Sequence, residues 1–182
     1  FTYDRIIIER LYSTDTLAVY IFFMSLSMAL FSLVEASIIT PNYRKILEMT
    51  SMSNEFLRAI NKLLLVSSSI FLLLFLISLP FINIITSITE KAILMENREW
   101  YFATSLIVFI LLLLSIVTKA LYAIKKDHTM FFINFGCTVL FIVTMNMFAL
   151  KTYALSIPII FSAILMVNLV AKIFSLKHFV DG

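Results

Sequence analysis

The chain has 182 residues, of which 62% are hydrophobic and 14% are charged, and its net charge is +3. Because a soluble domain is typically about 45–50% apolar and about 25% charged, this composition excludes an ordinary soluble domain, a disordered tail and a collagen-like rod. The single cysteine, Cys137, excludes a disulfide framework and a cysteine-based zinc cluster. The first predicted element is a partial helix before residue 16.

Five stretches are each long and apolar enough to cross a bilayer as an α-helix, which takes about 20 residues. They run over residues 16–39, 63–87, 100–118, 131–150 and 153–171. Helices are expected because open strands would leave backbone groups unpaired in lipid. The predicted fold class is therefore an all-α integral membrane bundle of about five transmembrane helices, forming one unit over residues 1–182.

The longest connector, residues 40–62, alternates apolar residues with charges. One interpretation is an amphipathic segment lying along the inner membrane surface. The other is a helical extension of the two neighbouring spans. The sequence leaves both open.

The connectors after the first and third spans, together with the C-terminal tail, carry more Lys and Arg than the other connectors. The positive-inside rule then places the C-terminus in the cytoplasm and Phe1 outside. Because no signal peptide is visible, an outside start calls for an earlier helix. We therefore expect that the chain lacks an upstream lobe, with a trimmed chain as the alternative.

Few residues have the type and spacing that catalysis or ligand binding requires. The two histidines, His128 and His178, are isolated, and the two glycines, Gly136 and Gly182, form no phosphate-binding loop. The small basic excess forms no stripe that would follow a nucleic-acid backbone. We expect no enzyme activity, no metal, no cofactor and no nucleic-acid partner.

Glu35 is the most costly residue of the predicted first span, because a charge at the bilayer centre costs roughly 2.5–3.5 kcal/mol on insertion scales. Lys119, at the same level of the third span, is a candidate partner inside a water-filled cavity. The alternative is that Glu35 is interfacial and hydrated while Lys119 snorkels.

Other polar and small residues predict helix contacts. Asn134, Asn146 and Asn168 fall inside spans, and each is expected to face another helix or a cavity rather than lipid. The first span also carries small residues at helical spacing that favour close helix approach: Ser25, Ala29, Ser32 and Ala36.

A series of local motifs resembles a known family. They are Asp4-Arg5-Ile6-Ile7-Ile8, then Tyr20, then Pro41 with Arg44 and Lys45, then Pro80-Phe81-Ile82, Trp100 and Tyr122-Ala123 before Lys125-Lys126. In this order they resemble one lobe of the Wzx-type polysaccharide biosynthesis (O-antigen) flippases, which are relatives of the multidrug and toxin extrusion (MATE-like) transporters. The chain is similar to the C-terminal lobe of such a two-lobe protein.

The resemblance implies a transporter of the bacterial inner membrane. It would turn undecaprenyl-diphosphate-linked oligosaccharide from the inner to the outer leaflet for surface polysaccharide synthesis. Its partners would be this lipid-linked oligosaccharide, membrane lipid and the missing N-terminal lobe. The cavity candidates that follow are Arg5, Arg10, Arg98 and Lys119 as cations for the diphosphate, and Glu35 or Asp4 as a group for ion coupling.

The sequence leaves three other functions open. A transporter of the same fold that exports a small cation or drug would favour carboxylates and aromatic residues in its cavity. A membrane-embedded enzyme of envelope synthesis, such as a polymerase or acyltransferase, would normally carry a large loop of clustered His, Arg or Asp. A non-catalytic membrane scaffold is the third.

Overall fold

The structure, a computed structural model, describes residues 3–48, 54–88, 92–148 and 156–181. These residues are almost entirely helical, and no strand occurs among them. The helices are α1 (Tyr3–Leu11), α2 (Thr14–Val34), the π-helix η1 (Glu35–Ile39), α3 (Thr40–Glu48), α4 (Asn54–Ile88), α5 (Ala92–Glu96), α6 (Glu99–Ala123), α7 (Asp127–Phe148) and α8 (Ser156–Asp181). The predicted all-α bundle, with a short helix before the first span, is confirmed.

Within the described ranges, five helices are long and apolar enough to cross a membrane, as predicted. They cover Thr14–Glu48, Glu55–Ile82, Glu99–Ala123, Asp127–Met147 and Ser156–Phe179. The last helix continues well past its predicted end at residue 171, so Lys172 lies inside it rather than in a tail. Residues 149–155, which include the predicted end of the fourth span and start of the fifth, lie outside the described residues.

The described parts of the connector, residues 40–48 and 54–62, are helical extensions of the neighbouring spans, whereas residues 49–53 lie outside the described residues. One continuous helix passes from α2 through η1 into α3, and α4 begins at Asn54. The π-helical turn is defined by the backbone N–H of Thr40, which donates to the carbonyl of Glu35, five residues earlier. Such π-bulges are rare and often occur at functional sites.

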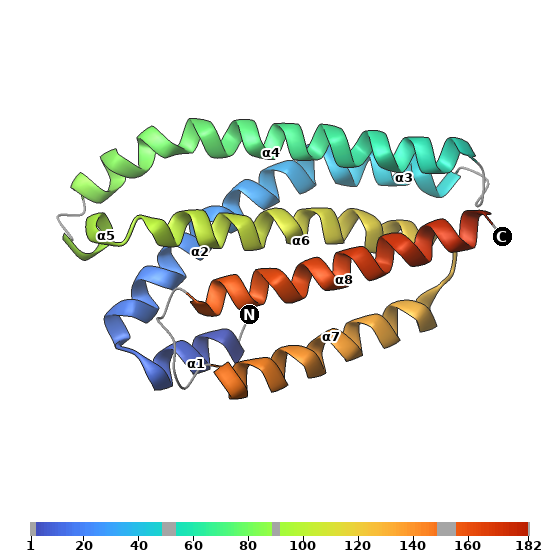
Figure 1. Ribbon diagram of the computed structural model, residues 1–182. Helices are drawn as coiled ribbons and strands as arrows, with labels where there is room; N and C mark the ends of the chain where they lie inside the picture. Colours follow the sequence, from blue (N-terminus) through green and yellow to red (C-terminus); the bar gives the residue numbers. More distant parts are fainter. Residues whose placement is uncertain (1–2, 49–53, 89–91, 149–155, 182) are drawn as a thin grey trace.

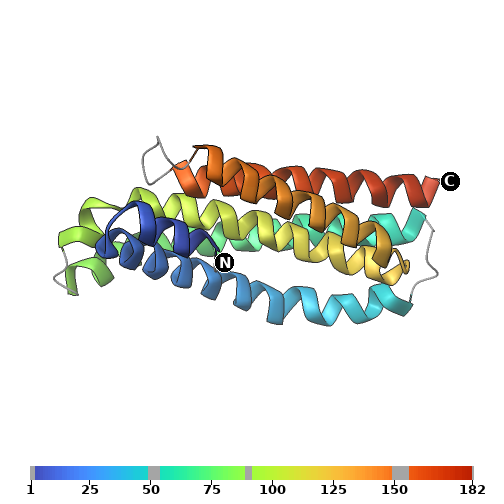
Figure 2. The ribbon, with the colours of Figure 1, turned by 90° about the horizontal axis from the view of Figure 1, so that it is seen from below.

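The helix α6 lies at the centre of the bundle (Figures 1 and 2). It packs against α2, α4 and α8, and its buried side chains are mostly Ile, Leu and Val. The helix α7 is peripheral and packs mainly against α8. The ends of α3, α6 and α8 gather at one end of the bundle, and α1, α5 and the beginning of α6 at the other (Figure 1).

The outer faces of α4 and α7 are strongly apolar. Their exposed large side chains include Leu65, Leu72, Leu73, Leu76 and Ile77 on α4, and Phe131, Phe132, Phe135, Val139 and Leu140 on α7. A soluble monomer rarely exposes a contiguous apolar area of this kind, whereas lipid solvates it without cost. These faces fit a multi-pass membrane protein.

The contact between α2 and α6 contains a buried polar cluster. The Ser27 hydroxyl is 3.2 Å from that of Thr104 and 3.0 Å from that of Ser105. The face of α2 predicted to approach another helix was the wrong one, because its small residues are all exposed: Ser25, Ala29, Ser32 and Ala36. The small residue that lets α2 approach α6 is Ser27.

We expect Ser27→Ala to lower the free energy of unfolding by about 0.5–1.5 kcal/mol, because hydrogen bonds between membrane helices typically contribute this much or less. Ser25→Ala is the matched control, since Ser25 is an exposed serine two residues earlier in the same helix. Equilibrium unfolding in mixed micelles measures both. Equal effects of the two substitutions would show that the buried hydroxyl cluster contributes nothing.

Candidate functional site: a groove with two lysines

A groove of about 510 Å³ runs between α2, α6, α7 and α8. It lies in the half of the bundle where α6 and α8 end. Seven side chains that carry a polar group line it: Ser115, Thr118, Lys119 and Tyr122 of α6, Asn134 of α7, and Asn168 and Lys172 of α8. All seven belong to the long apolar helices.

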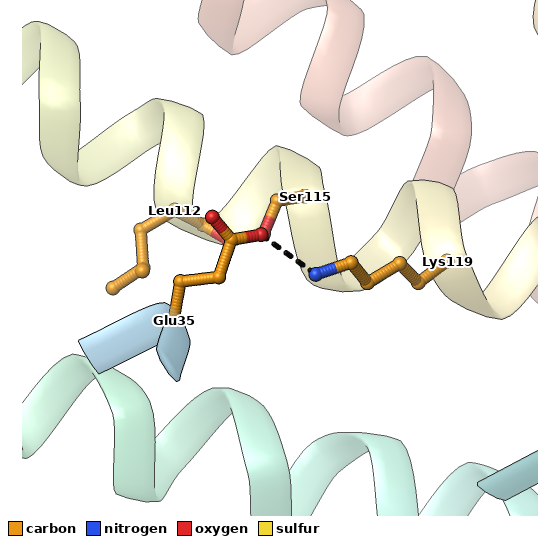
Figure 3. Close-up of polar contacts among 4 residues, drawn as sticks. All are labelled: Glu35, Leu112, Ser115 and Lys119. Carbon is orange, nitrogen blue, oxygen red and sulfur yellow. Dashed lines mark hydrogen bonds and ion pairs between the residues drawn. The ribbon is translucent and has the colours of Figure 1, made fainter. Parts of the chain in front are cut away.

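The ammonium of Lys119 forms an ion pair with Glu35 at the edge of this groove. Its Nζ donates to Oε1 of Glu35 at 2.7 Å, and the side chains are 26% and 33% exposed, respectively. Figure 3 shows the carboxylate reaching from the helix of Glu35 towards α6, next to Ser115. Of the two interpretations of Glu35, the structure supports direct pairing with Lys119.

The long helix that carries Glu35 supplies a second contact to Lys119. The Nζ atom lies over the ring of Tyr43, 6.0 Å from its centroid. Glu35 is the first residue of η1, and Tyr43 follows in α3. One helix therefore holds Lys119 by a carboxylate and an aromatic face.

Lys172 is the most deeply buried cation of the groove, with 4% of the residue exposed. Its Nζ donates to the hydroxyl of Thr118 at 2.9 Å, which joins α8 to α6. Among the residues that the structure describes, no carboxylate lies within ion-pair distance of this ammonium. Intramembrane lysines of this kind usually mark a ligand or ion pathway.

The two asparagines of the groove contact each other, so each of them faces another helix, as predicted. Asn168 is 8% exposed, and its Nδ2 donates to Oδ1 of Asn134 at 3.3 Å, which joins α8 to α7. Asn146 is exposed, and its amide donates to the carbonyl of Ile142 in its own helix at 2.7 Å.

A second polar contact lies at the opposite end of the bundle. The carboxylate of Asp4, in α1, is buried and accepts a hydrogen bond from the Tyr20 hydroxyl of α2. The Tyr20 ring packs edge-on against Trp100, with 5.9 Å between the centroids. This cluster fixes α1 to the start of α6.

The six residues predicted to line a cavity do not converge. Glu35 and Lys119 form the pair described above, whereas Asp4 is buried against Tyr20 near the other end. The three predicted arginines, Arg5, Arg10 and Arg98, are exposed and belong to that other end as well. Of the predicted cations, only Lys119 lines the groove.

Lys172 was not predicted to be a site residue. The predicted fifth span ended at Ala171, directly before this charge, although the helix continues. A usable signal was the spacing of Asn168 and Lys172, which lie four residues apart and therefore on one face of a helix. A polar pair at this spacing in an apolar helix indicates a polar contact or cavity.

Comparisons with known proteins add no relative. No protein-family model, no curated protein and no solved structure matches this chain. The resemblance to Wzx-type flippases therefore stays a prediction that rests on the motifs quoted for it. The two-lysine groove is the feature from which a function is inferred.

Proposed function

We propose that this protein forms one lobe of a transporter that turns undecaprenyl-diphosphate-linked oligosaccharide from the inner to the outer leaflet. Its place would be the bacterial inner membrane, with the C-terminus in the cytoplasm. A second lobe, upstream of this chain, would complete the cavity. The product would serve synthesis of a surface polysaccharide.

The observation that carries the proposal is the pair of lysines in a groove between membrane-spanning helices. Lys119 and Lys172 line one groove, and among the described residues a carboxylate, Glu35, pairs with Lys119 but none pairs with Lys172. The groove therefore holds more positive than negative charge. A diphosphate carries the opposite charge, and its interaction with an ammonium strengthens where water is scarce.

The geometry supports a simple exchange at Lys119. Without cargo, its ammonium is held by Glu35 at 2.7 Å. A diphosphate entering the groove would compete with this carboxylate for the ammonium. Rocking of the two lobes around the occupied cavity would then expose it to the other leaflet, and loss of the cargo would let Glu35 pair with Lys119 again.

Cells that lack the full-length gene test this proposal. We expect diphosphate-linked oligosaccharide to build up on the cytoplasmic leaflet, because its synthesis continues while its transfer stops. The intact gene should relieve the accumulation, and Lys119→Gln should not. Arg98→Gln is the matched control, because Arg98 is an exposed cation at the other end of the same helix; it should relieve accumulation like the intact gene.

One result would reject the flippase, and another would reject the role of Lys119 in it. One is an intact surface polysaccharide without accumulation in the deleted strain. The other is accumulation that Lys119→Gln relieves as fully as Arg98→Gln does. The first result would move the assignment to a different cargo, and the second would remove Lys119 from the path.

Export of a small cation is the second candidate. The buried carboxylate of Asp4, together with the aromatic rings of Tyr20 and Trp100, offers the chemistry that cations prefer. Increased sensitivity of the deleted strain to lipophilic cations, with lipid-linked oligosaccharide unchanged, would favour this function. Loss of resistance in Asp4→Asn would place the cation at this cluster.

A further inference from the structure

The charge of Lys172 is not balanced by the groove. The ammonium has three N–H donors, and one of them goes to Thr118 at 2.9 Å. The residue is 4% exposed, and no described carboxylate pairs with it. An ammonium buried in a membrane protein is costly unless an anion or several acceptors share its charge. The remaining donors of Lys172 therefore fit an anionic group.

The amide of Asn168 lies one turn before Lys172 and has an unused end. Its Nδ2 donates to Asn134, whereas its Oδ1 is buried without a hydrogen-bond partner among the described residues. Turning both amides over keeps the bond between the two asparagines, because each amide carries both a donor and an acceptor. Asn168 then presents an N–H donor beside Lys172. Such a donor also fits an anion.

The remaining wall of the groove is largely apolar. It is formed by Met28, Phe31, Leu111, Leu114 and Leu165, together with Tyr122. A small inorganic anion would leave these side chains uncovered, whereas the hydrocarbon next to a lipid headgroup would contact them. The volume of about 510 Å³ is within the usual range for a ligand pocket and suffices for a phosphate with the first part of a chain.

We propose that this groove binds a lipid phosphate, with the phosphate at Lys172 and Asn168 and the adjoining chain along the apolar wall. The phosphate belongs either to a phospholipid of the bilayer or to a polyprenyl-linked cargo. This deepens the proposed function at the same groove and rests on it for the polyprenyl-linked cargo, whereas binding at Lys172 itself requires no transport and holds for either source.

Binding of defined probes to the purified full-length protein, in neutral maltoside micelles, tests the site by calorimetry. The probes are dioctanoyl phosphatidic acid, undecaprenyl diphosphate, dioctanoylglycerol and inorganic phosphate. We expect at least one of the two lipid phosphates to bind about tenfold or more tightly than dioctanoylglycerol, which lacks the phosphate. Inorganic phosphate should bind more weakly than that lipid phosphate, since it has no chain for the apolar wall.

Substitutions in the groove test where the lipid phosphate binds. Lys172→Gln should weaken lipid phosphate binding about tenfold or more, and Lys172→Arg should retain most of it, because a charge-assisted hydrogen bond is lost only in the first. Lys177→Gln is the matched control, an exposed lysine on the same helix. Asn168→Asp provides a second disrupting variant if Lys172→Gln does not fold, because its carboxylate would pair with Lys172 and repel the phosphate.

Each outcome has a consequence. Tighter binding of phosphatidic acid identifies a bilayer phospholipid, and tighter binding of undecaprenyl diphosphate identifies the cargo. The site is overturned if neither lipid phosphate binds more tightly than dioctanoylglycerol, if inorganic phosphate binds as tightly as the better-bound lipid phosphate, or if the folded groove variants bind as the Lys177→Gln control does. Failure of the flippase in cells leaves this result untouched, because no transport is measured here.

Discussion

Glu35→Lys is expected to destabilise the protein by about 2 kcal/mol, and adding Lys119→Glu in the same chain should restore most of this loss. The single substitution places two ammonium groups where a pair at 2.7 Å now stands. The cost stays below the roughly 3–5 kcal/mol of breaking a fully buried pair, because both side chains keep partial access to solvent. Equilibrium unfolding of both single variants and the double variant gives the coupling free energy.

Glu48→Lys is the matched control for this cycle, because Glu48 is an exposed glutamate at the end of the same long helix. It should change the free energy of unfolding by less than about 0.5 kcal/mol, as surface substitutions usually do. A double variant that shows only the sum of the two single losses would mean that the pair contributes nothing to stability.

The same cycle separates structure from transport. If Lys119 alternates between Glu35 and a diphosphate, exchanging the two charges restores stability but leaves a carboxylate facing the groove. The double variant should then be folded and unable to relieve accumulation of lipid-linked oligosaccharide. Recovery of both stability and transport would mean that the pair only holds α6 to the first long helix.

The positions of the spans were predictable from hydropathy, but their ends were not. A bilayer sets the minimum apolar length of a helix and leaves its polar continuation free. The prediction stopped at the first charge after residue 171, whereas the backbone of α8 continues to Asp181. Lys172 was therefore placed in a tail, and the deepest cation of the groove was missed.

Which side of α2 packs against the rest of the protein was not predictable either. This helix is apolar around its whole circumference, so hydrophobic periodicity does not indicate which side meets the protein. Successive helical residues point about 100° apart, so Ser25 and Ser27 lie on nearly opposite faces. The spacing of small residues favoured Ser25, whereas the structure buries Ser27 against Thr104 and Ser105.

The pairing of Glu35 with Lys119 was easier to predict, because two opposite charges at equal depth have few other partners in a membrane. The contact of Asp4 was not predictable in this way. Its carboxylate accepts a hydrogen bond from the neutral Tyr20 in the neighbouring helix, and no charge pattern indicates a hydroxyl donor.

Trp100→Ala is expected to lower the free energy of unfolding by about 3–5 kcal/mol, the usual cost of truncating a large buried aromatic side chain. Trp100 is 3% exposed and supports the ring of Tyr20, which in turn donates to Asp4. The substitution therefore opens a cavity at the start of α6 and removes the support of α1. Equilibrium unfolding measures the global loss, and protease cleavage within α1 reports the local one.

Phe102→Ala is the matched control, because Phe102 lies two residues later on the same helix and is 55% exposed. Phe102→Ala should lower the free energy of unfolding much less than Trp100→Ala does, and it should leave α1 protected from protease cleavage. Lipid phosphate affinity separates the two ends of the bundle: folded Trp100→Ala protein should bind as the unaltered chain does, since Trp100 is remote from Lys172. Equal stability of the two variants would contradict the contribution of buried Trp100 to stability. A loss of lipid phosphate affinity in folded Trp100→Ala protein would mean that α1 and the groove are coupled through α6.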